Sequence, residues 1–222
     1  MAEHFHALTV AEVVPETDEA LSIRFAVPYE LQDQFQFKAG QHLTLMAIVD
    51  GEEVRRNYSL CTSPDEGELM VTVKRIAGGV FSNWAGDNLK AGDRVAVMPP
   101  HGSFTVPFSP DQRKHYVAFA GGSGITPIMS LIKTALSVEP DSRFTLFYGN
   151  RDSRSIIFLE ALADLKDRYL GRLELFHFLA EEEGTCRCST ACSMPSAVGK
   201  RWNTWSTRRK RSTSGSSAAP DR

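Results

Sequence analysis

The tetrapeptide Arg56-Asn57-Tyr58-Ser59 lies within residues 55–60, a run whose composition is typical of a β-strand. Residues two positions apart share a face of a strand, so we expect the side chains of Arg56 and Tyr58 on one side. A guanidinium can bind a pyrophosphate, a tyrosine ring can stack on a flat heterocycle, and a serine hydroxyl can bond to a ring nitrogen. The stretch therefore predicts a flavin site. The alternative is an ordinary strand whose tyrosine faces the core.

A second segment, Gly79-Val80-Phe81-Ser82, opens a stretch with helical spacing of apolar residues at Val80, Trp84 and Leu89. The first N–H groups of a helix have no intrahelical acceptor, and the helix dipole favours an anion there. A glycine at this point lets the backbone approach a ligand closely. The segment therefore predicts a phosphate-binding helix start.

A third segment, Gly121-Gly122-Ser123-Gly124-Ile125-Thr126-Pro127, follows the short apolar run 116–120. Thr126 is a candidate N-cap, and Pro127 would be the first helical residue. The glycine spacing is not the usual dinucleotide fingerprint, but the mechanics are the same, because a pyrophosphate can approach backbone amides at a helix start. The alternative is a strand-to-helix turn that needs glycine only for its geometry.

The pattern upstream of these glycines favours an antiparallel β-barrel. Short runs alternate between apolar and polar residues, as Leu21, Ile23 and Phe25 do, and turn sequences such as Asp50-Gly51 separate them. Many short strands at regular spacing are typical of barrels. The strands predicted here span residues 7–14, 20–27, 41–49, 55–60, 68–75 and 94–98.

Downstream of the barrel, predicted strands at 116–120, 143–148 and 173–179 alternate with helices, one after Pro127 and one over 156–169. Such alternation implies a parallel sheet of the nucleotide-binding α/β type. We therefore expect a flavin-binding barrel at 1–107, an incomplete NAD(P)-binding α/β domain at 113–183 and a separate tail at 184–222. The apolar helix faces are Ile128, Met129, Leu131, Ile132 and Leu136, then Phe158, Leu159, Leu162 and Leu165.

Two arginines, Arg151 and Arg154, follow the second strand of that sheet. The adenosine ribose of a dinucleotide lies near this point in such folds, and a guanidinium there favours a 2′-phosphate. The pattern predicts NADP rather than NAD. The alternative is a pair of solvated arginines that balance Asp152 and Glu160.

Taken in order, these motifs resemble the signatures of the ferredoxin-NADP+ reductase superfamily. Within it, the sequences of three segments are similar to those of the reductase subunits of bacterial phenylacetyl-CoA epoxidase (ring-hydroxylating) complexes. The segments are residues 5–10, 39–45 and 147–152. The similarity extends from residue 5 to about residue 183.

The resemblance implies FAD as cofactor and NADPH as electron donor. Arg56 would hold the FAD pyrophosphate, Tyr58 the ring face and Ser59 the N5 edge, so Ser59 and Tyr58 are the catalytic candidates. Hydride would pass from NADPH to the flavin, and single electrons would then pass to a [2Fe-2S] centre and an oxygenase component. The implied cofactor-binding residues are Arg56, Asn57, Tyr58, Ser59, Val73, Lys74, Arg75, Gly79, Val80, Phe81, Ser82, Gly121, Gly122, Gly124, Thr126, Pro127, Asn150, Arg151 and Arg154.

Composition predicts a cytoplasmic protein with no membrane segment. Of the 222 residues, 42% are hydrophobic and 23% charged, and no run approaches the roughly 18 apolar residues of a membrane span.

The cysteines predict no metal site. Cys61 is expected to be a small core residue. The spacing of Cys186, Cys188 and Cys192 fits neither the plant-type [2Fe-2S] pattern nor a zinc site, so we predict no metal.

Residues 184–222 hold eight Lys and Arg side chains and a single acidic residue, Asp221. This basic, serine-rich tail is typical of a disordered segment, and a nucleic-acid-binding tail is the alternative. If each codon is regrouped one base earlier, residues 212–222 permit Val-Asp-Glu-Trp-Phe-Ile-Cys-Gly-Pro-Gly-Pro, which contains the Cys-Gly-Pro segment of the family. We therefore expect a truncated chain, frameshifted after about residue 183, that binds no nucleic acid.

Three functions remain open from the sequence. The first is an FAD-dependent NAD(P)H oxidoreductase that feeds an iron-sulfur partner. The second is a flavin-binding fragment without full turnover, because the nicotinamide half-site and the iron-sulfur ligands are missing. The third is a nucleic-acid-binding protein that acts through its tail.

Overall fold

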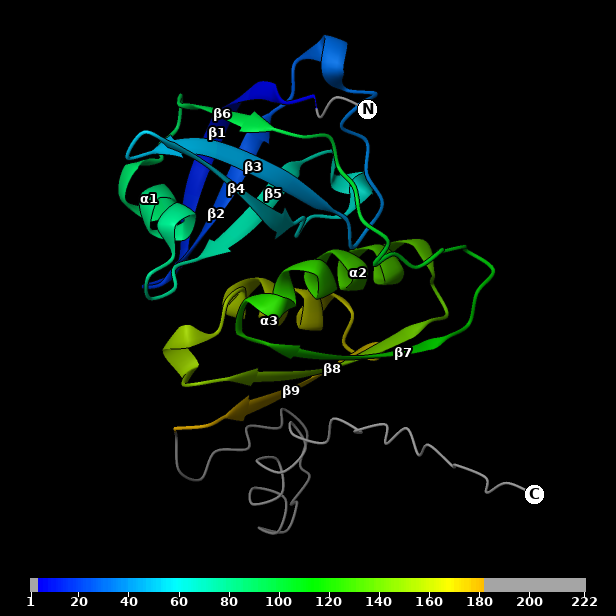
Figure 1. Cartoon of the computed structure of the whole chain (residues 1–222). Coiled ribbons are helices and arrows are strands. Elements are labelled where there is room, and N and C mark those ends of the chain that lie inside the picture. Colours follow the sequence, from blue (N-terminus) through cyan, green and yellow to red (C-terminus); the bar gives the residue numbers. More distant parts are fainter. Residues whose placement is uncertain (1–3, 182–222) are drawn as a thin grey trace, which may run out of the picture. The chain divides into compact units, whose positions relative to one another are not determined.

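A computed structural model describes residues 4–181 of the chain (Figure 1). The predictions for the tail, which include the change of reading frame, the absence of nucleic-acid binding and the three cysteines Cys186, Cys188 and Cys192, lie outside these residues. Among the helices of the described part, none has the length and apolar composition required to cross a bilayer.

The first part of the chain is a six-stranded antiparallel sheet with the order β4-β3-β6-β1-β2-β5, which confirms the predicted class. Between β3 and β4, Asp50 and Gly51 have φ values of 53° and 84°, as a two-residue hairpin turn requires. Alternate residues of every strand enter one apolar core, with Leu8, Ile23 and Val71 fully buried. The strands are β1 (His6–Thr17), β2 (Ala20–Ala26), β3 (His42–Val49), β4 (Glu52–Ser59), β5 (Leu69–Lys74) and β6 (Arg94–Val97).

The outer strands of this sheet, β4 and β5, close it into a barrel only at one end. Leu60, just after β4, forms an isolated bridge with Val71, and the Cys61 N–H donates to the Met70 carbonyl at 3.1 Å. Within residues 4–181, no other ladder pair joins these two strands. The barrel therefore stays open between the end of β4 and the end of β5.

Helix α1 (Val80–Asn88) follows β5 and contacts β3, β4 and β5. Phe81 and Ala85 are buried against the barrel core, whereas Val80 is 48% exposed. Arg75, at the end of β5, forms an ion pair with Asp87. The predicted helix start after Gly79 is confirmed.

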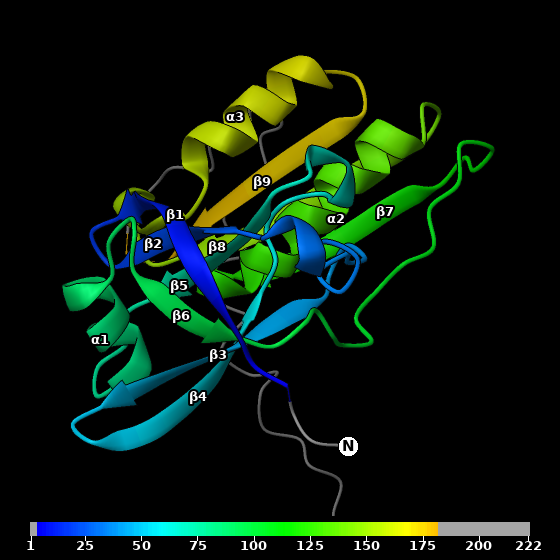
Figure 2. The same cartoon turned by 90° about the horizontal axis from the view of Figure 1, so that it is seen from above.

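The second part of the chain is a parallel sheet with the order β7-β8-β9, as predicted. Because consecutive right-handed crossovers in one direction place their helices on one side, both helices cover the same face (Figure 1, Figure 2). The elements are β7 (His115–Gly121), α2 (Ile125–Val138), β8 (Arg143–Asn150), α3 (Leu159–Arg168) and β9 (Leu173–Leu179).

The opposite face of the parallel sheet carries a ladder of phenylalanine rings. Phe119 stacks on Phe147 with centroids 4.9 Å apart, and Phe147 stacks on Phe176 at 5.0 Å. Phe119 is 66% exposed. No helix of the described residues covers this face.

The predicted N-cap of α2 was wrong. The helix begins at Ile125 with Gly124 as its N-cap, so Thr126 and Pro127 lie inside the first turn. The Thr126 hydroxyl donates to the Ser123 carbonyl at 2.6 Å and caps nothing. Pro127 is tolerated there because N–H groups of the first turn have no helical acceptor.

The start of α3 was also predicted too early, and one of its face residues was misplaced. Asp152 accepts a bond from the Ser155 N–H at 2.9 Å and caps a separate 3-10 turn, η4 (Ser153–Ser155). Phe158 then takes a left-handed φ of 64°, which no helix interior allows. The helix therefore starts at Leu159, whose side chain is 47% exposed rather than on the buried face.

Barrel residues pack into the core of the parallel-sheet part. Cys61 is buried in the same apolar cluster as Ile132 of α2, which confirms it as a core residue. Its burial raises the pKa of the thiol to about 12. The Ser130 hydroxyl of α2 donates to the Thr62 carbonyl at 2.6 Å, so α2 is fixed against the loop that follows β4.

Candidate functional site

A cavity of about 410 Å³ brings the three sequence motifs together. The open edges of β4 and β5, the start of α1 and the loop before α2 all contribute to its wall. The residues that line it are Arg56, Asn57, Tyr58, Ser59, Thr72, Lys74, Ile76, Gly79, Val80, Phe81, Ser82, Ser123, Gly124, Thr126 and Pro127. We call this cavity the cleft.

Arg56 lies on β4 opposite Leu45 and is exposed at the wall of the cleft. Its guanidinium donates to the carbonyl of the preceding residue, Arg55, at 2.7 Å. Within the described part of the chain, it forms no ion pair with a carboxylate. The positive charge is therefore available to an anionic ligand.

Tyr58 combines features of both sequence interpretations. Its ring packs against Phe81 with centroids 5.5 Å apart, yet the side chain is only half-buried and also lines the cleft. Burial raises the pKa of the hydroxyl to about 12, against the opposing effect of the Arg56 charge. The phenol therefore stays neutral at physiological pH, and one side of the residue meets the cavity.

Ser59 ends β4 at the wall of the cleft, next to Tyr58. Alternation along the strand places the Asn57 side chain on the face opposite to those of Arg56 and Tyr58. There its amide oxygen accepts a hydrogen bond from the Thr44 hydroxyl at 2.8 Å. Asn57 borders the cleft, but its amide is committed within the barrel.

The free edge of β5 presents backbone groups to the cleft. The Arg75 N–H donates to the Glu19 carbonyl at 2.6 Å, whereas the Met70 carbonyl accepts from the other side of the strand. Backbone groups of an antiparallel strand alternate in direction, so those of Thr72 and Lys74 point to the free edge. Those of Val73 point to β2, where Val73 pairs with Leu21.

Among the predicted residues of this stretch, only Lys74 lines the cleft. The Val73 side chain is fully buried in the barrel core. The Arg75 side chain lies against Gly86 of α1 and pairs with Asp87. Thr72, which sequence reasoning missed, lines the cleft instead, and the period-two alternation from Lys74 was the signal that pointed to it.

The start of α1 has a built anion-binding geometry. Gly79 is its N-cap, and no side chain caps the first turn. A Cβ at Gly79 would lie 2.4 Å from the Ser82 hydroxyl oxygen and 2.6 Å from Cγ1 of Ile76, so a larger residue would require both side chains to move. The free N–H groups of this turn belong to residues that line the cleft together with Arg56 and Lys74.

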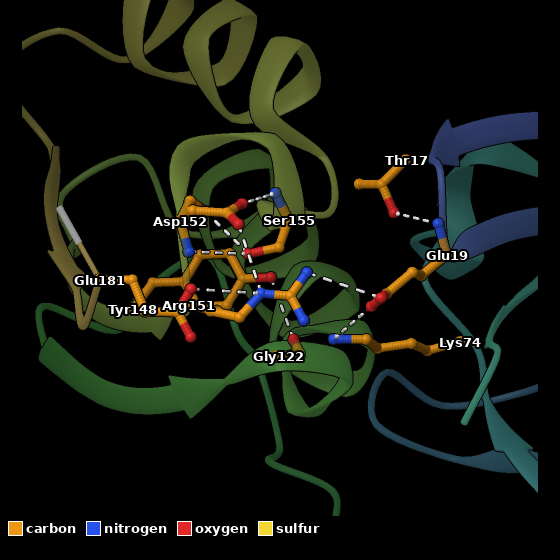
Figure 3. Close-up of polar contacts among 9 residues, drawn as sticks. All are labelled: Thr17, Glu19, Lys74, Gly122, Tyr148, Arg151, Asp152, Ser155 and Glu181. Carbon is orange, nitrogen blue, oxygen red and sulfur yellow. Dashed lines mark hydrogen bonds and ion pairs between the residues drawn. The ribbon is translucent and has the colours of Figure 1, made fainter. Parts of the chain in front are cut away.

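The glycine loop after β7 forms the opposite wall. It contains a 3-10 turn, η3 (Gly122–Gly124), in which Gly122 has a φ of 50°. The buried Tyr148 hydroxyl donates to the Gly122 carbonyl at 3.0 Å and fixes the loop (Figure 3). A Cβ at Gly122 would lie 3.8 Å from the Lys74 ammonium, so that cation lies beside the loop. Gly121 and Gly122 shape the loop without lining the cleft.

Asn150, Arg151 and Arg154 lie at the carboxyl end of β8, outside the cleft. Asn150 is only 9% exposed, and neither polar atom of its amide has a hydrogen-bond partner within residues 4–181. Arg154 is exposed.

Arg151 lies among carboxylates from two parts of the chain (Figure 3). Its guanidinium nitrogens lie 3.3 Å from Asp152, 3.5 Å from Glu19 of the barrel and 3.9 Å from Glu181. The hydrogen bond to Asp152 and the charge of Glu19 raise the pKa of the guanidinium. Glu160, an expected partner, forms no ion pair with Arg151 among the described residues.

The sequence matches models of two protein domains. The model described as "Oxidoreductase FAD-binding domain" matches residues 7–106, and the model described as "Oxidoreductase NAD-binding domain" matches residues 119–195. A ferredoxin-NADP+ reductase from Plasmodium falciparum shares the fold, with a TM-score of 0.69 at 17% identity over 84% of this chain and 77% of that one. The chain therefore combines the FAD-binding and NAD-binding domains of an oxidoreductase.

Two characterised proteins show higher sequence identity to this chain. One subunit of the 1,2-phenylacetyl-CoA epoxidase of Escherichia coli is 50% identical over 178 residues, which are 80% of this chain and 50% of that protein. The ferredoxin reductase component of the 3-ketosteroid-9-alpha-monooxygenase of Mycobacterium tuberculosis is 44% identical over 192 residues, 83% of this chain and 52% of that protein. The chain thus spans about half the length of these relatives.

Proposed function

We propose that this chain is an FAD-dependent NAD(P)H reductase that delivers electrons to an iron-sulfur centre and then to an oxygenase. One observation carries the proposal. A single cleft joins the open edge of an FAD-type barrel to the glycine loop of an NAD-type sheet, so groups held by the two parts would meet. A shared cavity of this kind is where a donor and an acceptor of hydride have to lie.

The residues present fit FAD. Arg56 supplies a cation without a carboxylate partner in the described residues, β5 supplies free backbone groups, and the start of α1 supplies uncapped N–H groups. These suit a pyrophosphate joined to a flat polar ring. When bound, FAD supplies the chemistry, since it accepts a hydride and can release electrons one at a time.

The chain's own residues position the cofactors and shield them from water. Tyr58 would cover the face of the flavin ring, and Ser59 would offer its hydroxyl to the ring edge. Arg56 and the start of α1 would bind the phosphates of FAD. The glycine loop and the start of α2 bind the second dinucleotide. No side chain is required to act as an acid or base, so holding two ring systems at reacting distance is the protein's main contribution.

The relatives favour an oxygenase as the final electron acceptor. One is named as a subunit of the phenylacetyl-CoA epoxidase, and another as the reductase component of a monooxygenase. We propose the same kind of partner here, with the phenylacetyl-CoA epoxidase system as the specific candidate. The higher of the two identities, 50%, supports that choice.

The test begins with the purified full chain. We expect the absorption bands of bound flavin and, under anaerobic conditions, their bleaching on addition of NADPH. A colourless chain that takes up no FAD would refute the proposal. A yellow chain that NADPH does not bleach would instead favour a flavin-binding protein without turnover.

Cofactor preference provides a separate prediction. Arg151→Ala should weaken NADPH binding by about tenfold or more while leaving NADH nearly unchanged, because a charged hydrogen bond to a phosphate is worth about 1.5–3 kcal/mol. The matched control is Arg143→Ala, which removes an exposed guanidinium from the opposite end of β8. Dissociation constants from fluorescence titration measure both, and equal losses for the two nucleotides would show that Arg151 meets no 2′-phosphate.

A further inference from the structure

Glu19 places a carboxylate between two cations of the proposed nucleotide site (Figure 3). Its side chain lies 3.7 Å from the Lys74 ammonium and 3.5 Å from the Arg151 guanidinium. Lys74 lies beside the glycine loop, and Arg151 follows β8. One barrel carboxylate therefore contacts a cation at each of the two positions where a phosphorylated dinucleotide needs one.

The backbone of Glu19 is held firmly in the turn between β1 and β2. Its N–H donates to the Thr17 hydroxyl at 3.2 Å, and its carbonyl accepts from the Arg75 N–H. The carboxylate is held much less firmly. Both of its ion-pair distances exceed normal hydrogen-bond length, and its side chain is 44% exposed. The backbone of Glu19 is therefore fixed, whereas its carboxylate is loosely paired. A ligand could displace this carboxylate from its cations without disturbing the turn.

We propose that Glu19 is a specificity-determining residue that competes with the 2′-phosphate of NADPH for Arg151. The inference rests on the proposed function, and Glu19 touches no reacting atom. In the nucleotide-free chain the carboxylate pairs with Arg151, and the 2′-phosphate has to replace it. NADH carries a neutral hydroxyl in place of the 2′-phosphate and has no charge to compete, so Glu19 reduces the preference for NADPH over NADH.

The other carboxylates near Arg151 are placed differently. Asp152 accepts from the Ser155 N–H at 2.9 Å and caps η4, so its carboxylate is already committed within its own turn. Glu181 lies further away, at 3.9 Å. Glu19 is the only one of the three that belongs to the barrel, so its displacement also breaks an ion pair between the barrel and the parallel sheet.

Removing the charge of Glu19 should therefore strengthen binding of a 2′-phosphate more than that of a 5′-phosphate, because the carboxylate lies nearer to Arg151 than to Lys74. We expect Glu19→Gln to bind adenosine 2′,5′-bisphosphate about threefold more tightly, as the loss of one exposed competing ion pair allows. Adenosine 5′-monophosphate, which can gain only through Lys74, should gain less. Asp18→Asn removes the same charge from the neighbouring position, which is exposed in the same turn, and is the matched control.

The experiment is a calorimetric titration of the flavin-loaded full chain with each of these two nucleotides. The larger gain of the bisphosphate in Glu19→Gln should disappear when Arg151→Ala is added, because the guanidinium for which Glu19 and the 2′-phosphate compete is then absent. No gain with the bisphosphate, an equal gain with the monophosphate, or the same gain in Asp18→Asn would each overturn the inference.

The same titrations separate this inference from the proposed function. If Arg151→Ala does not weaken binding of the bisphosphate, the proposed NADP site itself is wrong. If Arg151→Ala weakens binding and Glu19→Gln has no effect, only the role of Glu19 fails, and its ion pair is then a structural tether. Thermal unfolding of every variant confirms that the protein titrated is folded.

Discussion

The double variant Arg56→Ala/Tyr58→Ala is expected to purify without flavin. Arg56 supplies a charge that no carboxylate of the described residues neutralises, and Tyr58 supplies a ring at the same wall of the cleft. Loss of a charged hydrogen bond or of a stacked ring costs about 1–3 kcal/mol each. If the two losses add, affinity should fall by about 30-fold to 10⁴-fold, which titration of the apoprotein with FAD will measure.

Two neighbouring substitutions test whether this loss is specific. Arg55→Ala removes a guanidinium one position away, which strand alternation turns to the other face, where Arg55 pairs with Glu53. Its affinity for FAD should stay within about twofold of the unmodified chain. Tyr58→Phe keeps the ring and should retain most of the binding. A double variant that binds FAD normally would refute the flavin site on β4.

Gly40→Ala should cause the largest loss of stability. Gly40 precedes β3 with a φ of 90°, and a Cβ there would lie 1.9 Å from the Phe104 carbonyl oxygen. Backbone strain of this kind costs about 1–3 kcal/mol, and the collision with another backbone segment adds to it. We expect the free energy of unfolding to fall by about 3 kcal/mol or more, as measured by urea denaturation.

The control is Gly51→Ala in the turn between β3 and β4. Gly51 has a similar φ of 84°, but nothing lies within 4 Å of a Cβ at that position. It should lose only about 1 kcal/mol, which is the strain without the collision. Equal losses in the two variants would show that the segment containing Phe104 moves away freely.

The sequence predicted strands better than helix boundaries, for a physical reason. A strand buried on one face has apolar residues at every second position, as Leu21, Ile23 and Phe25 show in β2. This alternation can be recognised directly in the sequence. The start of α3 depends instead on the cap that Asp152 makes to Ser155 and on the left-handed Phe158. Neither feature leaves a periodic signal.

For the site, the sequence located the motifs but not their partners. Tyr58 and Gly79 belong to local patterns, and both line the cleft. The contact between Glu19 and Arg151 joins segments that only the folded chain brings together, so no local pattern could indicate it. The commitment of the Asn57 amide to Thr44 depends in the same way on strand pairing.

Because the barrel stays open between β4 and β5, a cofactor bound there would contribute to the stability of the fold. A ligand that binds only the folded barrel stabilises it by RT ln(1 + [L]/Kd), which is about 2.7 kcal/mol at a hundredfold excess over Kd. That is a large share of the total stability of a typical domain. Since the backbone groups of Thr72 and Lys74 at this opening meet no neighbouring strand within residues 4–181, the stabilisation would act where the barrel is least closed. The abundance of this chain in a cell would then follow the supply of flavin, because chains synthesised faster than flavin is available would reach proteases first.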